Sequence, residues 1–204
     1  MKDQSGHNGL WVAPTNRRSS PVRISSTAIE DSPFFLPDGD LVFRVAEGGT
    51  NYLYRMKSDG SGRRKLTSEP VLDVLTVSPD GHWIVAASPN PDQEHTVAVR
   101  ALAVNGSEAV TLCLDYCSFR WDTAGKFVYV YISQLHGSSY ALPVLHDSGL
   151  PRVSPGDIAR IEHEANAKTI TAIPQLVHSA VSPSLYAYTR QTTRRNLYRI
   201  QLPY

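Results

Sequence analysis

The sequence lacks the features that would place it in several large classes of protein. Only two of its 204 residues are cysteine, so a network of disulfides cannot hold the fold together. Lys and Arg number 20 against 19 Asp and Glu, and the formal net charge of +1 gives no global attraction to nucleic acid or anionic membranes. No apolar run approaches the ~20 residues of a membrane helix. Residues 1–24 also lack the apolar segment of a signal peptide.

Positive charge is concentrated only in three short clusters. Each cluster flanks the end of a predicted strand, so we interpret them as solvated turn positions rather than phosphate sites. They are Arg17-Arg18, Arg63-Arg64-Lys65 and Arg194-Arg195. We therefore expect no nucleic-acid partner and no membrane segment.

The motifs of common hydrolases and kinases are absent. There is no G-x-S-x-G pentapeptide, and the serines of His136-Gly137-Ser138-Ser139 fall in a predicted hairpin loop. The kinase motifs H-R-D and D-F-G are missing, as is the phosphate-binding G-x-x-x-x-G-K-[ST]. We predict no catalytic residue and no cofactor-binding residue.

Metal-binding patterns are incomplete. His163-Glu164 begins like the zinc motif H-E-x-x-H, but Ala167 stands where the second histidine belongs. The seven histidines show no spacing that requires a common centre. Four aspartates would suit calcium, yet their regular turn positions favour a structural role: Asp38, Asp59, Asp80 and Asp92. We predict no metal site.

The two cysteines lie four positions apart. Cys113 falls at the end of one predicted outer strand and Cys117 at the start of the next inner strand, so a bridge across the loop is geometrically conceivable. Free cysteines are often buried as small hydrophobic residues, and we favour that interpretation over a bridge. The sequence leaves both states open.

Three stretches of the chain can be aligned at a period of about 43 residues. They are Asp31–Thr67, Val74–Leu112 and a more divergent copy from Ser118 to Val153. In each, runs of β-branched and aromatic residues are broken by Gly, Pro, Asp and Asn, which predicts four short strands. Four-stranded antiparallel units at this period are typical of β-propeller blades, so we predict an all-β partial propeller.

Regular turns separate the first and second strands of each copy. In S-P-D-G, from Ser78 to Gly81, proline sets φ for the first central position and glycine can adopt positive φ. Residues 36–39 repeat this turn, whereas 122–125 keep only the glycine. The second strands that follow are apolar on both faces, which predicts that they are covered on both sides: Leu41–Val45, Trp83–Ala87 and Phe127–Ile132.

The remaining strands complete the predicted blades. Third strands are expected at Tyr52–Met56, Thr96–Leu102 and Ser139–Val144. Outer strands are expected at Arg64–Thr67, Ala109–Leu112 and Arg152-Val153.

We predict one domain over residues 1–204, a propeller fragment with three full blades and two partial ones. The blade pieces are 9–27, 31–68, 73–113, 117–153 and 169–204, where the last includes a strand at Asn196–Leu202. Residues 154–168 interrupt the period. Ser154 as N-cap, Pro155 at the first helical position and Asp157 three residues after the cap predict a short helix near 155–165.

The repeat resembles that of TolB-like β-propellers, relatives of the WD repeat. The resemblance rests on S-P-D-G followed by L-Y-x-M-x-x-D-G-S-G-x-x-x-L-T, best matched by Asp31–Thr67. The segment from Tyr186 also resembles the C-terminal end of TolB-like propellers appended to bacterial serine/threonine kinases or transcriptional regulators. This implies a C-terminal sensory or interaction part of a larger bacterial signalling or envelope protein, in a periplasmic or other extracytoplasmic location.

A repeat without catalytic motifs predicts a non-catalytic module that binds a protein, peptide or other ligand. Two alternatives remain. The chain can be the gating propeller of a prolyl-oligopeptidase-like serine hydrolase whose catalytic domain lies outside it, or a structural spacer. The parent protein can still be a kinase, although this chain has no kinase motif.

An open arc of blades exposes the faces of its terminal blades. We expect apolar residues on these faces to allow self-association or to leave the isolated chain marginally stable. The residues concerned are Leu10, Trp11, Tyr186, Tyr188 and Leu197.

Overall fold

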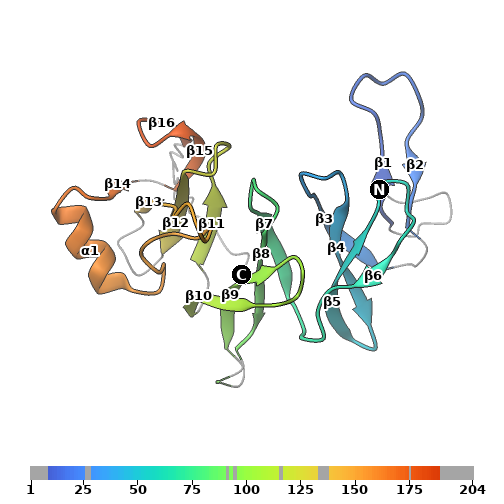
Figure 1. Cartoon of the computed structure of the whole chain (residues 1–204), viewed down its shortest axis with the longest axis horizontal. Coiled ribbons are helices and arrows are strands. Elements are labelled where there is room, and N and C mark those ends of the chain that lie inside the picture. The colour runs from blue at the N-terminus through green and yellow to red at the C-terminus, as the bar shows by residue number, and fades with distance from the viewer. Residues whose placement is uncertain are drawn as a thin grey trace, which may run out of the picture.

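Three four-stranded antiparallel sheets stand in a row, with a two-stranded sheet at each end (Figure 1). The computed structural model describes residues 9–25, 29–90, 92–93, 96–114, 117–132, 138–174 and 176–188. The predicted all-β architecture, a partial propeller with one short helix, is confirmed. In each full blade the strands are paired in chain order from the inner to the outer strand.

The blades have the following strands. Blade 1 contains β3 (Glu30–Phe35), β4 (Leu41–Glu47), β5 (Thr50–Met56) and β6 (Arg64–Lys65). Blade 2 contains β7 (Asp73–Val77), β8 (Trp83–Pro89), β9 (Val97–Ala103) and β10 (Ala109–Leu114). Blade 3 contains β11 (Cys117–Trp121), β12 (Phe127–Ile132), β13 (Ser139–Pro143) and β14 (Thr171–Ile173). The first partial blade pairs β1 (Trp11–Val12) with β2 (Val22–Arg23), and the last pairs β15 (Val177–Ser182) with β16 (Leu185–Tyr188).

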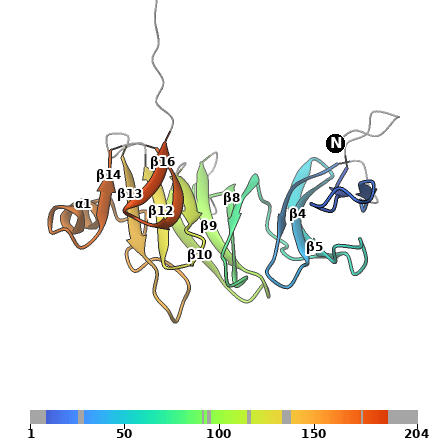
Figure 2. The same cartoon turned by 90° about the horizontal axis from the view of Figure 1, so that it is seen from above.

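The second strand of each full blade supplies side chains to the cores on both sides of its sheet. Along β8, Trp83 and Val85 pack toward blade 3, whereas Ile84 and Ala86 pack toward blade 1. The same alternation in β4 and β12 creates four hydrophobic clusters. One cluster lies at each junction between neighbouring sheets of the row, and Figure 2 shows this row from above. Burying a large apolar side chain contributes roughly 1.5–3 kcal/mol, so these junctions hold the row together.

The turn glycines have the predicted backbone conformation and also contact the neighbouring blade. The φ angles of Gly39, Gly81 and Gly125 are +88°, +74° and +68°. A Cβ built on Gly81 would lie 2.8 Å from Cδ of Pro37, and one on Gly125 would lie 3.7 Å from the ring of Pro79. The proline of one turn thus packs on the glycine of the next, an inter-blade contact that the sequence did not reveal.

The cysteines form a disulfide, which corrects our preference for two buried thiols. The Sγ atoms of Cys113 and Cys117 are 1.96 Å apart. Both residues are also buried, at 4% and 1% exposure, so the predicted burial was right and the predicted redox state was wrong. The reason is local: only two residues separate β10 from β11, so the two strand ends are brought together with a Cα–Cα distance of 6.5 Å.

The period-breaking segment lies inside blade 3, not after it. The outer strand of this blade is β14, which pairs with β13, whereas the sequence assigned that strand to Arg152-Val153. The residues from Val144 to Ile170 therefore form a long connection between the third and outer strands. An isolated bridge between Val144 and Pro151 and a bond from the Arg152 N–H to the Pro143 carbonyl show why this stretch resembles a strand.

The connection contains α1 (Ile158–Asn166), the short helix predicted near 155–165. The predicted N-cap was wrong, because Asp157 caps the helix by accepting a hydrogen bond from the Arg160 N–H at 3.1 Å. The Ser154 hydroxyl instead donates to the Leu112 carbonyl at 3.1 Å and fixes the connection to β10. On the buried side of the helix, Ile161 is fully enclosed in the cluster between blades 2 and 3.

The residues expected on exposed terminal faces differ in environment. Leu10 is buried against blade 1, at 5% exposure, which corrects our expectation for it. Trp11 and Tyr186 are half-buried, Tyr188 is 48% exposed, and Leu197 lies outside the described residues together with the predicted strand at 196–202. Self-association through these faces stays a prediction.

Candidate functional site

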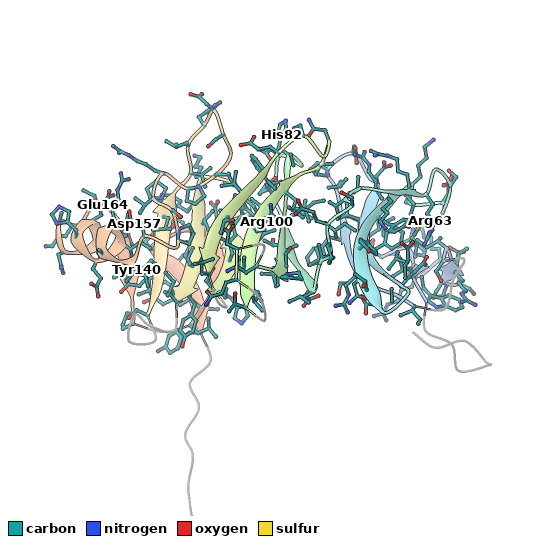
Figure 3. All side chains as sticks on the ribbon, turned by 90° about the horizontal axis from the view of Figure 1, so that it is seen from below. Arg63, His82, Arg100, Tyr140, Asp157 and Glu164 are labelled. Carbon is teal, nitrogen blue, oxygen red and sulfur yellow. A yellow bond between two sulfur atoms is a disulfide. The ribbon has the colours of Figure 1, made fainter. Side chains whose placement is uncertain are left out.

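A groove crosses one edge of the row from blade 1 to blade 3. This edge, the turn face, carries the turns that join first to second strands and third to outer strands. Three hollows of about 290, 660 and 630 Å³ make up the groove. The first two share Ala103, Ser107 and Glu108, and the last two share Asp80, His146 and Gly149, so neighbouring hollows adjoin one another. His82 marks the turn face of blade 2 in Figure 3.

A hairpin loop at residues 145–150, the strap, forms part of the groove wall. The N–H of Leu145 donates to the carbonyl of Leu150 at 2.8 Å, and the N–H of Gly149 donates to the carbonyl of Leu145 at 2.9 Å. Two indole N–H groups hold the loop in place by hydrogen bonds to its backbone carbonyls. Trp83 of blade 2 donates through Nε1 to the Ser148 carbonyl at 2.6 Å, and Trp121 of blade 3 donates to the Gly149 carbonyl at 3.2 Å. The strap is therefore fixed to two blades at once.

Gly149 is required for this close approach. Its φ is +67°, and a Cβ on it would lie 2.8 Å from Oδ2 of Asp80 and 3.5 Å from the Trp83 indole. A side chain here would combine backbone strain with a clash, so the position favours glycine.

On its blade 1 side, the central hollow is lined by two arginines, one that is ion-paired and one that forms no ion pair with a described residue. Arg55 forms ion pairs with Asp38 at 2.5 Å and Asp40 at 2.7 Å. Burial opposes the Arg55 charge, but the hydrogen bonds and charges of both carboxylates outweigh it and raise the pKa of Arg55. Arg64 lies opposite Arg55 in the β5–β6 register and on the same face of the sheet. No ion pair of Arg64 occurs within the described ranges.

The negatively charged side chains of the groove that form no ion pair with a described residue lie over blade 2 and on the strap. Glu108 and Asp147 are exposed and line the central hollow, and neither forms an ion pair within the part of the chain that the structure describes. Lys126, which lines the hollow over blade 3, likewise forms no side-chain ion pair with a described residue. The free charges of the groove are thus two positive and two negative.

Asp80 is held by its own turn. Its carboxylate accepts hydrogen bonds from the Ser78 hydroxyl at 2.5 Å and the His82 N–H at 3.0 Å. Burial would raise its pKa, but the hydrogen bonds from Ser78 and His82 outweigh burial and lower the pKa of Asp80. Asp38 and Asp59 accept the N–H two residues later in the same way, which agrees with a structural role for these turn carboxylates.

Three of the serines that line the groove are engaged in turns. Ser78 donates to Asp80, Ser107 donates to Asn105, and the Ser148 hydroxyl accepts the Leu150 N–H. Within the described ranges, none of these three is hydrogen-bonded to a histidine, so they form no nucleophile and base pair. No group of three or more His, Cys, Asp or Glu side chains arranged to hold a metal occurs among the residues described. His136 and Gly137 lie outside them.

The residues of the basic cluster Arg63-Arg64-Lys65 differ in environment. Arg64 and Lys65 are exposed, as expected, but belong to β6 and not to a turn, whereas Arg63 is half-buried, which corrects the interpretation of it as a solvated residue. Arg63 pairs with the buried Glu30 at 3.0 Å, and its guanidinium lies 4.4 Å from the centre of the Tyr54 ring. Lys65 pairs with Glu47 at 2.9 Å. Only Arg64 is directed toward the groove. The Arg17-Arg18 pair is exposed as expected, and Arg194-Arg195 lies outside the described residues.

The sequence did not predict the groove residues, because the turn pattern of the repeat already explains why each of them occurs where it does. Arg64 had a partial signal, since it lies opposite Arg55 in a predicted hairpin. The aspartates that neutralise Arg55, Asp38 and Asp40, belong to the preceding turn between β3 and β4. The strap had none, because residues 145–150 belong to the long connection between β13 and β14, which has no counterpart in the other two copies of the repeat.

Comparison with known proteins identifies the fold. The chain is 43% identical over 73 residues to the Tol-Pal system protein TolB of Anaeromyxobacter dehalogenans strain 2CP-C, and 42% identical over the same length to TolB of Anaeromyxobacter sp. strain K. Each match covers 35% of this chain and 16% of the relative, so the chain matches only a small part of these proteins. No protein-family model matches.

A solved structure extends the likeness to most of the chain. The putative TolB from Agrobacterium tumefaciens superimposes with a TM-score of 0.53 at 16% identity, over 76% of this chain and 57% of that one. The chain therefore has a TolB-like β-propeller fold, as its repeat predicts. Among the described residues, no helix is long and apolar enough to span a membrane.

Proposed function

We propose that this chain is a non-catalytic, protein-binding propeller module and that the turn-face groove is its binding surface. The observation that carries the proposal is the row of three adjoining hollows lined by residues of three blades. This extent favours an extended polypeptide segment over a compact small molecule, which occupies a single closed pocket of about 300–1,000 Å³. The balanced free charges, two positive and two negative, disfavour nucleic acid and anionic membranes, which recruit one sign of charge.

The similarity to TolB supports a protein partner. The relatives are named as proteins of the Tol-Pal system. From that name we carry over to this chain only a role in assembling with other proteins. The chain would then serve as an interaction part of a larger bacterial envelope or signalling protein.

We also propose an extracytoplasmic location. The disulfide supports it, because disulfides persist in oxidising compartments and are rare in the cytosol. Both cysteines are buried, which disfavours a role as exposed redox sensors. Trapping free thiols with an alkylating agent in intact cells would test it, and a fully reduced pair in the native protein would contradict it.

Selection of peptides from a random 12-residue phage library on the immobilised chain tests the binding function. We expect enrichment of peptides whose binding is lost with Ser107→Trp, because this residue lines two of the three hollows and an indole there would fill the groove.

The matched control is Ser61→Trp. Ser61 occupies the corresponding turn of blade 1, with the same hydrogen bond from its N–H to a side-chain oxygen two residues earlier, but it does not line the groove. Binding that survives Ser107→Trp, or no enrichment at all, would contradict the proposal.

A further inference from the structure

We infer that the groove selects an extended segment with basic residues at its centre and acidic residues on both sides. This inference rests on the proposed function and names the chemistry of the partner. The inference follows from the order, along the groove, of the charged side chains that form no ion pair with a described residue.

The order runs from positive through negative to positive. Arg64 belongs to β6 of blade 1 and lines the central hollow from the blade 1 side. Glu108, in the outer turn of blade 2, and Asp147, on the strap that lies over blades 2 and 3, provide the negative centre. Lys126 follows the turn of blade 3 and lines the hollow over that blade. A complementary segment therefore carries negative, positive and negative charge in turn.

The other charged groups of the groove are already committed. Arg55 is neutralised by two aspartates, and the Asp80 carboxylate is held by Ser78 and His82. A partner would have to break these interactions to use their charge. The four charged side chains without an ion pair among the described residues therefore determine the charge selectivity, because they can bind a partner without breaking existing interactions.

The symmetry of this order has a practical consequence. A segment with a basic centre and acidic flanks presents the same pattern when it lies in the groove in either direction. Charge selectivity is then measurable without knowing the direction of binding.

Two labelled peptides of identical composition test the inference. In one, EESSKKKKSSEE, the centre is basic and the flanks are acidic; in the other, KKSSEEEESSKK, the order is inverted. Because exposed ion pairs contribute about 0.2–1 kcal/mol each, we expect the first peptide to bind about tenfold more tightly at low salt. The difference should diminish as salt is raised.

Charge reversal in the protein should alter this preference. Arg64→Glu and Asp147→Lys should each reduce the ratio of the two affinities about threefold or more. The controls are Arg18→Glu and Asp92→Lys, exposed residues outside the groove that should leave the ratio unchanged. Thermal melting of each variant checks that it is folded.

Equal affinity for the two peptides, or a preference that the Arg64 and Asp147 variants do not reduce, would overturn the inference. The proposed function would survive that outcome if library peptides still bound and Ser107→Trp still blocked them. Loss of all library binding would instead contradict the proposed function itself.

Discussion

The junction between blades 2 and 3 and the junction between blades 1 and 2 are held together differently. At the first, an extensive hydrophobic cluster is supplemented by the disulfide, the strap and Ile161 of α1. At the second, a smaller cluster is supplemented by polar contacts. Ser32 donates to Asp73 at 3.0 Å, and Arg44 donates to the Leu72 carbonyl.

This difference shows that one repeat geometry can be stabilised by different means at successive junctions. In repeat proteins, stability is approximately a sum of unit and nearest-neighbour terms, so each junction can be perturbed separately. The groove crosses both junctions. Blades 2 and 3 are joined by the disulfide and the strap, whereas the position of Arg64 depends on the junction that has no disulfide.

The largest expected effect comes from truncating Phe119 at the junction of blades 2 and 3. Phe119 is 2% exposed and lies edge-on to Trp121 with ring centroids 4.9 Å apart. Phe119→Ala should lower the free energy of unfolding by about 3–5 kcal/mol, measured by urea denaturation.

Leu53→Ala provides the comparison at the other junction, where Leu53 is fully buried. It should cost about 2–5 kcal/mol but leave amide protection in blade 3 largely intact. Equal loss of protection in all three blades after either substitution would show that the junctions are not separable.

The turn glycines give the next largest effect. Gly39→Ala should cost about 1–2 kcal/mol for the positive φ alone, since a Cβ there meets no atom within 4 Å. Gly81→Ala should cost a further 1–3 kcal/mol or so, because its Cβ would meet Pro37 at 2.8 Å. Gly125→Ala should resemble Gly39→Ala, since its nearest contact is 3.7 Å. If thermal denaturation showed the same loss of stability at all three positions, the contact between Gly81 and Pro37 would not contribute to the stability of this junction.

The disulfide should contribute only modestly to the free energy of unfolding, although it is a covalent bond. It joins residues only four apart in sequence, and closing so short a loop stabilises by about 2 kcal/mol through chain entropy. The double variant Cys113→Ser/Cys117→Ser should therefore remain folded and melt at a lower temperature than the oxidised protein. Complete unfolding would mean that the bridge, rather than the hydrophobic cluster, holds blades 2 and 3 together.

The smallest effect concerns acid stability through Asp80. Its folded pKa lies below the unfolded value of roughly 3.9, so its stabilising contribution is complete above about pH 4 and is lost as the pH falls through the folded value. Asp80→Asn should reduce stability at pH 7 and have a smaller effect at pH 3, measured by urea denaturation at each pH. The same loss at both values would show that packing, and not the carboxylate charge, matters at this position.

The sequence predicted the features that repeat, because they follow from local patterns. Two-sided apolar runs such as Trp83–Ala87 require cover on both faces, and a glycine at position 81 marks the turn. The disulfide joins residues only four apart, but it forms because the packed blades bring the ends of β10 and β11 together. The outer strand of blade 3 and the N-cap at Asp157 depend instead on contacts between segments distant in sequence. Ser154 illustrates this, since it is a good capping residue that the Leu112 carbonyl engages instead.

The groove was not predictable for a related reason. Its free charges are defined by which neighbours are already paired, and only the packed blades show that Arg55 is neutralised while Arg64 is not. The strap depends on two tryptophans from different blades that donate to one loop.

Hydrogen exchange of the chain with and without a peptide selected from the library tests the central claim most directly. Binding in the groove should increase amide protection in the blade 2 turn at 103–108 and in the strap at 145–150, and leave the corresponding blade 1 turn at 57–62 unchanged. Protection confined to other segments, with the strap and the 103–108 turn unaffected, would contradict the account.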